Sequence, residues 1–278
     1  MVLKKPRNPY AGSDFYGKVI KVGSKVTTYK VDDLVFGDLS SSKFGAYSSY
    51  IDCYEKDVML APNNLNASEI AALQMPTSTA LTAIKKAKLK TNNQILIYGA
   101  SGGVGLALTQ ILTSKGYHVD VVASQKHHEV LKQLGVNNIF DYNDSFFKLP
   151  NNRYNTIFAV NGYQKLKTYR KSLKKKGRYI GIGGDMRQTS EASMKGFYYN
   201  LFTSKKVKTV FSKTTKELLK EIKELAETNV LKPKIGKVYK LDDVKTAYEE
   251  FSKNTYSGKI ILESTDDNNF YEKCFIVS

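Results

Sequence analysis

Apolar positions follow two patterns along the chain. From residue 94 onward, short runs that are apolar throughout alternate with stretches that have helical spacing. The apolar runs are Ile95–Tyr98, Val119–Ala123, Thr156–Val160 and Arg178–Ile182. Parallel strands covered by helices on both faces are apolar along their whole length, because neither face meets water. The pattern therefore predicts an α/β fold, a doubly wound parallel sheet of the Rossmann type, over residues 76–215.

The flanking segments have a different character. Residues 12–60 contain β-branched and aromatic runs interrupted by glycines, which predicts a compact β region. A helix is expected over Ala67–Lys88, with Asn66 or Ser68 as its N-cap and Pro76 dividing it. Two further helices and a strand are expected at Thr214–Thr228, Asp242–Lys253 and Lys259–Leu262, with Asp242 or Asp243 capping the second helix. We therefore expect residues 1–75 and 216–278 to form a second, β-rich domain. We assign no role to residues 264–278.

A glycine motif joins the first apolar run to the helix that follows it. Gly99, Gly102 and Gly105 have the spacing G-x-x-G-x-x-G, and Ser101 lies within the motif. A dinucleotide site needs a turn without Cβ atoms, so that the backbone can approach a pyrophosphate at the start of a helix. A glycine turn without any ligand is the alternative. The strand before the motif and the helix and strand after it favour the cofactor site, including Gly103, Val104 and the hydroxyl of Ser101.

The end of the second apolar run bears on the choice of cofactor. An NAD site places an acidic residue here, about 20 residues past the glycines, whereas this chain has Ala123, Ser124, Gln125 and Lys126. Ser124 could donate a hydroxyl hydrogen bond to a 2′-phosphate, and Lys126 could supply a positive charge. We therefore predict NADP(H). Asp120, inside the run, is the residue that would favour NADH. We interpret His127 and His128 as solvated.

Composition narrows the alternatives. The 278 residues include 43 Lys and Arg against 26 Asp and Glu, which gives a net charge of +17. A basic stretch with Lys165, Arg170 and Arg178 could bind nucleic acid, but a solvated lysine-rich face is the favoured interpretation. Two cysteines exclude a disulfide framework and a four-thiolate zinc site. We see neither an export signal nor a membrane span, and expect a cytoplasmic protein without a metal.

Several motifs together resemble a known family, the medium-chain dehydrogenase/reductases, and most closely their zinc-independent quinone oxidoreductase branch, also called zeta-crystallin-like. The motifs are Gly12–Phe15 with Gly17, Val22–Val26, Val31–Gly37, Tyr98–Gly105, Asp141–Tyr142 and Gly258–Ile260. The resemblance implies a GroES-like domain interrupted by a Rossmann domain. It also implies that Ser124, Lys126 and Tyr142 hold the 2′-phosphate of NADPH and that Thr82 lies near the nicotinamide. Zinc-dependent relatives have a histidine ligand at the position of Ser13 and a cysteine ligand near the position of Ser78. This chain has neither ligand.

The same resemblance raises one reservation. Family members usually have a further β-rich segment ahead of the Gly12 motif, so we expect the GroES-like domain to be partly truncated and its exposed strand edges to pair in a homodimer. The function predicted is hydride transfer from NADPH to a quinone or to another small electrophile, an activated carbonyl or alkene compound. A non-catalytic NADPH-binding protein is the alternative, and we assign no catalytic residue.

Overall fold

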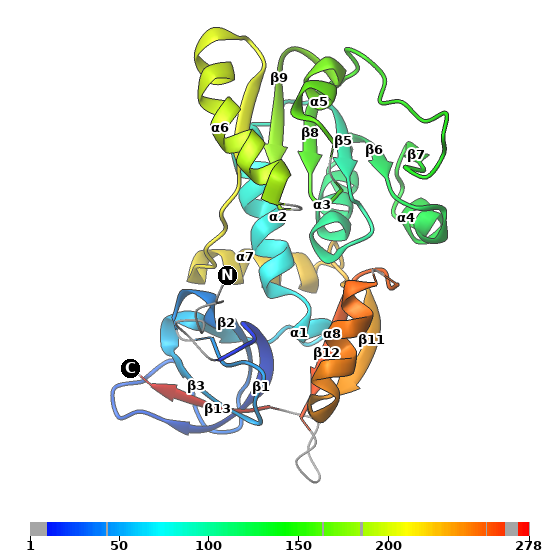
Figure 1. The fold of residues 1–278 in the computed structure, drawn as a ribbon. Coiled ribbons are helices and arrows are strands. Elements are labelled where there is room, and N and C mark those ends of the chain that lie inside the picture. The colour runs from blue at the N-terminus through cyan, green and yellow to red at the C-terminus, as the bar shows by residue number, and fades with distance from the viewer. Residues whose placement is uncertain are drawn as a thin grey trace, which may run out of the picture. The chain divides into compact units, whose positions relative to one another are not determined.

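The computed structural model describes residues 10–42, 44–162, 164–183, 186–253, 255–264 and 272–277. The chain divides into two compact units, of which unit 1 comprises residues 1–78 and 213–278 and unit 2 comprises residues 79–212 (Figure 1). The two units are described separately.

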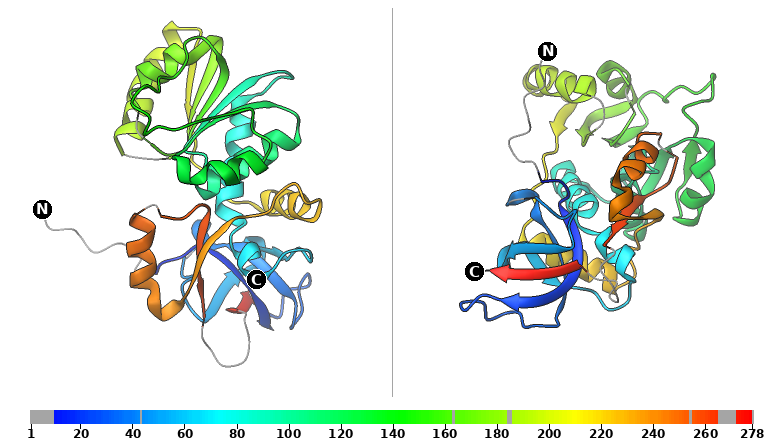
Figure 2. Two further views of the ribbon diagram at one scale, coloured as in Figure 1. Left: turned by 90° about the vertical axis from the view of Figure 1, so that its right-hand side faces the viewer. Right: turned by 60° about the horizontal axis from the view of Figure 1, so that its bottom comes forward.

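Unit 2 is built on a six-stranded sheet in which every neighbouring pair is parallel. The strand order is β10 (Lys206–Thr209), β9 (Leu173–Gly181), β8 (Tyr154–Ala159), β5 (Gln94–Tyr98), β6 (His118–Val122) and β7 (Asn138–Phe140). The helices are α2 (Gln74–Ala87), whose first turns belong to unit 1, α3 (Gly103–Ser114), α4 (His128–Gln133), α5 (Leu166–Ser172) and α6 (Met186–Phe202) (Figure 2). This is the predicted doubly wound parallel sheet.

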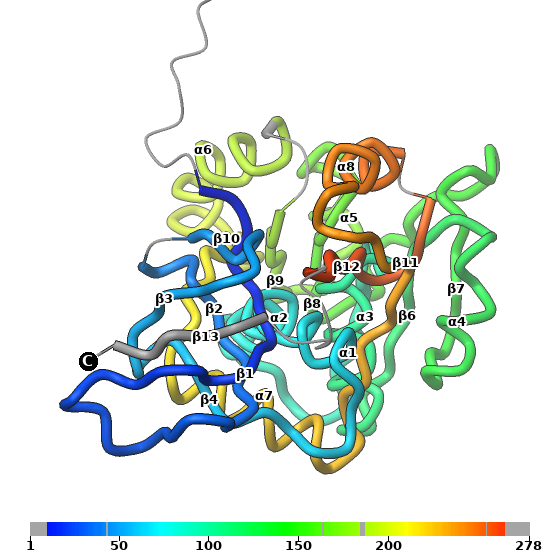
Figure 3. Tube along the Cα trace, turned by 90° about the horizontal axis from the view of Figure 1, so that it is seen from below, coloured from blue at the N-terminus to red at the C-terminus, as the bar shows by residue number. Residues whose placement is uncertain are grey.

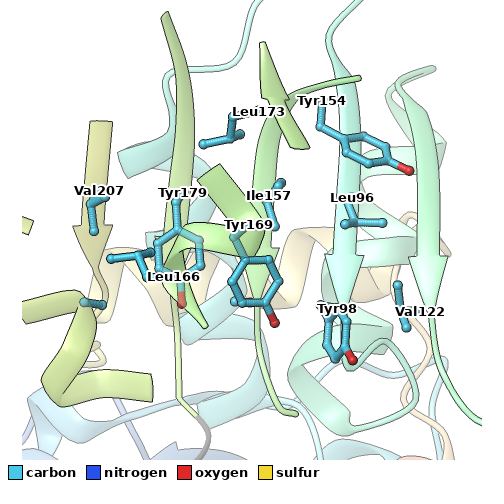
Figure 4. Close-up of a cluster of buried hydrophobic side chains, with 12 residues drawn as sticks. Leu96, Tyr98, Val122, Tyr154, Ile157, Leu166, Tyr169, Leu173, Tyr179 and Val207 are labelled. Carbon is cyan, nitrogen blue, oxygen red and sulfur yellow. The ribbon is translucent and has the colours of Figure 1, made fainter. Parts of the chain in front are cut away.

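Both faces of this sheet are buried, which explains the continuously apolar strands. On one face, side chains from α5 and α6 pack against Leu96, Ile157 and Val207. Four tyrosines lie in the same layer and are almost fully buried: Tyr98, Tyr154, Tyr169 and Tyr179 (Figure 4). Residues such as Ile95 and Ile97 alternate to the opposite face, where α3 packs against β5 and β6.

Unit 1 contains a five-stranded sheet in the order β3 (Tyr50–Tyr54), β13 (Glu272–Val277), β1 (Asp14–Val22), β2 (Leu34–Asp38) and β4 (Val58–Leu60). Antiparallel pairing joins β1 to β2 and β2 to β4 (Figure 3). A parallel pair consists of β11 (Ile235–Lys240) and β12 (Lys259–Glu263). The helices of unit 1 are α1 (Ala67–Ala71), α7 (Lys216–Glu227) and α8 (Val244–Ser252), and 3₁₀ turns span Leu39–Ser41, Glu55–Asp57 and Leu241–Asp243.

The C-terminal residues have a place that the sequence analysis did not assign. Of residues 264–278, the segment Glu272–Val277 forms β13, which pairs in parallel with β1 on one side and β3 on the other (Figure 1). About 250 residues separate β13 from β1, so no local pattern signals this pairing, and we identified no strand here. β13 therefore pairs with one edge of β1 and one edge of β3 within the chain itself.

The structure corrects one helix prediction, confirms a second and partly confirms a third. The break in the predicted helix at 67–88 lies at Ala72 and Leu73, before Pro76, which occupies the first turn of α2, where its missing N–H costs nothing. Asn66 is the N-cap of α1 and forms a reciprocal capping box with Glu69. Asp243 occupies the cap position of α8 but makes no side-chain cap hydrogen bond.

Helix α6 was not predicted, and its burial pattern explains why. Its inward-facing residues include Gln188, Ala192 and Gly196, which are polar or small and carry no apolar periodicity. Its large apolar side chains face outward instead. A helix of this kind lacks the amphipathic signal on which sequence analysis depends.

Candidate functional site

The turn after β5 requires two of its three motif glycines for structural reasons. Gly99 has φ +85°, and a Cβ atom there would lie 2.5 Å from the carbonyl oxygen of Asn161. A Cβ atom on Gly105 would lie 2.4 Å from the carbonyl oxygen of Gly99, because α3 starts directly against the turn. Both glycines are therefore needed to build the strand–turn–helix unit.

Gly102 is different, because the protein itself does not require a glycine there. Its φ of −79° and ψ of 169° suit any residue, and a Cβ atom would meet nothing within 4 Å. It is the N-cap of α3 but offers no side chain to the helix. The first intrahelical bond runs from the Leu106 N–H to the Gly102 carbonyl, so the amides of Gly103, Val104 and Gly105 precede that bond. A glycine here fits the close approach of an anionic group to these amides.

The loop after β6 contains a buried hydroxyl group without a hydrogen bond. Ser124 is 7% exposed, and within the part of the chain that the structure describes its Oγ has no partner. Buried hydroxyl groups are normally hydrogen-bonded, because leaving one unpaired costs free energy. Lys126 lies two residues further on, within a 3₁₀ turn (Gln125–His127), and its side chain is exposed. These two residues present a hydroxyl donor and a cation at the carboxyl end of a sheet strand.

Tyr142 belongs to the same corner of unit 2, because Asp141 connects its loop to the loop of Ser124. The Asp141 carboxylate accepts hydrogen bonds from the Gln125 N–H at 3.1 Å and from the Asn143 N–H at 2.8 Å. The loop after β7 is thereby held against the loop after β6, and Tyr142 follows Asp141 with half of its side chain exposed. The structure thus brings Ser124, Lys126 and Tyr142 onto adjoining loops, and Asp141 supplies a connection that we did not foresee.

Asp120 does not lie where a ribose-binding carboxylate would. It is fully buried in the middle of β6, where it pairs with Arg153 at 2.8 Å. Its oxygens also accept hydrogen bonds from the Asn138 amide at 2.7 Å and the Tyr154 hydroxyl at 3.0 Å. A buried carboxylate needs such partners, so Asp120 is engaged in holding β6, β7 and β8 together.

The two neighbouring histidines correct a further expectation. We predicted that His127 and His128 are solvated, yet His127 is buried, and its burial lowers the pKa of the imidazole. His128 is half-buried, with Nε2 3.1 Å from the Ala123 carbonyl oxygen.

Thr82, predicted to lie near the nicotinamide, is in α2 with its hydroxyl 3.3 Å from that of Ser212. The functions of Thr82 and Ser101 stay predictions.

Unit 1 contains a buried polar cluster that the sequence analysis missed. The Thr214 hydroxyl donates a hydrogen bond to the Asp38 carboxylate, and it lies 3.0 Å from the Ser78 hydroxyl. Asp14, in β1, accepts hydrogen bonds from the Met75 N–H and the Ser13 hydroxyl, both at 3.3 Å. These six residues come from four segments that are distant in the sequence, so only their proximity in the fold could have revealed the cluster.

Asp14 is the titratable member of this cluster near neutral pH. Its side chain is 9% exposed, and the Lys259 ammonium lies 3.7 Å away. Burial raises the pKa of Asp14 to about 6, Lys259 opposes that shift, and the charge of Asp38 reinforces it. A carboxyl group of this kind can exchange a proton close to neutral pH.

The raised pKa of Asp14 predicts a pH-dependent stability. Because the folded state holds this proton more tightly than the unfolded state, the stability that Asp14 contributes is present below pH ~4 and is lost as pH rises through about 6. Asp14→Asn removes this dependence. We expect the free energy of unfolding of the variant, relative to wild type, to increase by up to about 3 kcal/mol between pH 4 and 7. Urea unfolding followed by circular dichroism at each pH measures this free energy.

Asp242→Asn, at an exposed carboxylate, is the control. An equal pH profile for both variants would refute the prediction.

Comparison with known proteins identifies the family. A family model described as "Zinc-binding dehydrogenase" matches residues 134–262. The chain is 30% identical over 272 residues to a quinone oxidoreductase of Pongo abelii, and the match covers 93% of this chain and 81% of that protein. The chain belongs to the medium-chain dehydrogenase/reductase family, in its quinone oxidoreductase-like branch.

Other relatives of this dehydrogenase/reductase agree with that placement. A Dictyostelium discoideum protein named "NAD(P)H oxidoreductase RTN4IP1, mitochondrial" is 29% identical, over 91% of this chain and 80% of that protein. A quinone oxidoreductase structure from Coxiella burnetii superposes with a TM-score of 0.76 at 23% identity, covering 91% of this chain and 78% of that one, which supports the shared fold.

Among the described residues, the structure has neither a cluster of metal ligands nor a membrane-spanning helix. In the ranges given above, we find no group of three or more His, Cys, Asp or Glu side chains placed to hold a metal ion. The helices within those ranges are too short or too polar to cross a membrane.

Proposed function

We propose that this protein is a zinc-independent, NADPH-dependent oxidoreductase that transfers hydride to a quinone or to an activated carbonyl or alkene compound. The observation that carries the proposal is the buried Ser124 hydroxyl, which has no described partner. Lys126 lies two residues further along the same loop, and Asp141 joins that loop to the loop of Tyr142. A 2′-phosphate would accept a hydrogen bond from this hydroxyl and would be attracted by the lysine. Membership in the quinone oxidoreductase-like branch supports the reaction class.

The chain would bind the remainder of the cofactor through its backbone. The amides at the start of α3 and the absence of a side chain at Gly102 suit a pyrophosphate. Asp141, whose carboxylate is bonded to the loop of Ser124, directs both oxygens to backbone amides. Its charge is therefore partly compensated, which is compatible with a phosphate nearby.

Bound NADPH supplies the hydride, so the protein contributes orientation and exclusion of water more than acid–base groups. Zinc independence is supported by Ser13, at the position of the histidine ligand in zinc-dependent relatives, and by Ser78, near the position of their cysteine ligand. Ser13 donates to the Asp14 carboxylate, and the Ser78 hydroxyl lies against Thr214. Hydroxyl groups engaged in this way are poor substitutes for imidazole and thiolate zinc ligands.

A direct test combines binding and turnover. We expect the purified protein to enhance NADPH fluorescence with a lower Kd than for NADH, and to oxidise NADPH when a quinone or enone is added. Saturated ketones serve as the control substrates, because they are weaker electrophiles. Binding without turnover across the panel would leave a cofactor-binding protein only. Absence of NADPH binding would refute the proposal altogether.

A further inference from the structure

Two side chains at the carboxyl ends of the unit 2 strands contain a buried polar atom without a hydrogen bond. One is Ser124, after β6, and the other is Gln188, in the first turn of α6, which follows β9 (Figure 1). The described part of unit 2 has two further atoms of this kind, on His118 at the amino end of β6 and on Arg170 in the last turn of α5. Buried acceptors are normally hydrogen-bonded. The Gln188 carbonyl oxygen, Oε1, therefore lacks a donor at the edge of the sheet where we propose that the cofactor binds.

The orientation of the Gln188 amide is fixed by the groups around it. The side chain is 3% exposed, and its Nε2 donates to the Ala159 carbonyl oxygen at 3.3 Å and to the Gly183 carbonyl oxygen at 3.2 Å. Burial raises the pKa of Tyr179, and a hydrogen bond from Gln188 opposes that shift. Carbonyl groups can only accept, so the nitrogen of the amide must face them and Oε1 is the end without a partner.

Holding the ends of β8 and β9 together does not by itself explain a glutamine. That role uses only the N–H groups of Gln188, which a lysine or an arginine could supply without adding a buried acceptor. An unpaired buried carbonyl oxygen costs free energy. A bound molecule with an N–H group directed at Oε1 would offset that cost.

The strand order places the two halves of a dinucleotide on opposite sides of β5. The chain runs from β5 to β6 and β7 on one side and then returns to β8, β9 and β10 on the other. Dinucleotides bind across the point where the strand order reverses. The adenosine half is assigned to the β6 side by Ser124 and Lys126, so the nicotinamide half would lie along the ends of β8 and β9. Neighbouring strands are about 4.8 Å apart, so Gln188 lies roughly 7 Å from β5 along this edge, a length that a ribose and its base can span.

We propose that Gln188 Oε1 accepts a hydrogen bond from the carboxamide NH₂ group of the nicotinamide, which makes Gln188 a cofactor-binding residue at the reactive end of NADP(H). This inference rests on the proposed function, because it requires the cofactor site. The carboxamide is the only part of the nicotinamide ring system with N–H donors, so a buried acceptor is suited to recognise it. Fixing the carboxamide would also fix the rotation of the ring, and therefore the ring face that is turned toward the substrate.

An analogue of the cofactor tests this contact in the unmodified, full-length protein. The acetylpyridine analogue of NADP⁺ has a methyl group in place of the carboxamide NH₂ group and is otherwise the same molecule. We expect its Kd to be about tenfold higher than that of NADP⁺, because the buried Gln188 oxygen would be left without a donor. Isothermal titration calorimetry measures both Kd values without any turnover. Equal Kd values for the two molecules would overturn the proposal.

Gln188→Met assigns the discrimination to this side chain. Methionine has a similar length but no amide, so we expect the variant to bind NADP⁺ about tenfold more weakly and to bind the analogue and NADP⁺ equally well. A merely structural role would weaken both molecules alike and preserve their ratio, which would contradict the proposal. Gln133→Met, at an exposed glutamine of α4, is the matched control and should leave both Kd values unchanged. Circular dichroism verifies folding, and if Gln188→Met does not fold, the comparison in the wild type decides.

Adenosine 2′,5′-bisphosphate separates failure of this inference from failure of the proposed function. It carries the 2′-phosphate but no nicotinamide, so we expect it to bind the wild type and Gln188→Met alike. If it binds while the wild type does not distinguish NADP⁺ from the analogue, Gln188 does not contact the carboxamide and the cofactor site stands. If neither the bisphosphate nor NADP⁺ binds, the proposed function is wrong and this inference is wrong with it.

Discussion

Lys126→Glu raises the Kd for NADPH by roughly 10- to 100-fold, whereas the Kd for NADH changes little. A hydrogen bond to a charged group contributes about 1.5–3 kcal/mol, and each ~1.4 kcal/mol is tenfold in affinity. Reversing the charge removes that contribution and adds repulsion of the 2′-phosphate, a group that NADH does not have. Fluorescence titration of both cofactors measures the ratio of the two Kd values.

Lys132→Glu is the matched control for this effect. Lys132 is an exposed lysine of α4, six residues further on, so its replacement changes the net charge of the chain equally. We expect it to alter both Kd values less than threefold at ~0.15 M salt, because screening limits the reach of exposed charges to about 8 Å. If the two variants lose NADPH affinity alike, Lys126 attracts the cofactor only through the general field. If Lys126→Glu weakens both cofactors alike, the predicted phosphate contact is wrong.

Gly102→Asp abolishes binding of NADPH and NADH while the protein keeps its stability. The position is an N-cap, where aspartate is among the best residues, and the added Cβ meets nothing within 4 Å. The carboxylate would lie against the pyrophosphate, and two like charges 4 Å apart repel by about 4 kcal/mol at an effective dielectric constant of 20, or more than ~100-fold in affinity. Cofactor titration and urea unfolding of the same preparation measure the two effects.

Gly99→Ala, in contrast, is expected to lower the stability of the protein. It places a Cβ atom 2.5 Å from the Asn161 carbonyl oxygen at a φ of +85°, so we expect a loss of stability of about 2 kcal/mol or more. The pair of variants separates a glycine needed by a ligand from a glycine needed by the fold. Unimpaired cofactor binding by Gly102→Asp would show that no pyrophosphate lies at α3, and its failure to fold would show that Gly102 is structural.

Much of unit 2 could be predicted from the sequence because its signals are local. A strand that is apolar throughout reports burial on both faces, and glycines directly after it report a close turn into a helix. The same holds for the end of β6, where Ser124 and Lys126 stand in place of an acidic residue. Each of these signals depends on neighbours along the chain, so no knowledge of the tertiary fold was needed.

Other features depended on segments that meet only in the folded chain. Asp120 looked like a possible ribose ligand until Arg153, Asn138 and Tyr154 were seen to engage its carboxylate. The burial of His127 and the hydrogen bonds through which Asp141 connects two loops could not be predicted from the sequence either. Asp14 is recognisable as a proton-exchanging group only in the folded chain, because burial and the charge of Asp38 raise its pKa.

Hydrophobic periodicity and glycine spacing act over a few residues, so the α/β architecture of unit 2, the glycine turn and the chemical character of the β6 loop can be inferred from the sequence. Three other features are visible only in the folded chain: β13 pairs between β1 and β3, Asp14 and Asp38 share a buried cluster, and α6 turns its apolar side outward. Those outcomes depend on contacts between residues far apart in the chain, whose energies no local pattern encodes.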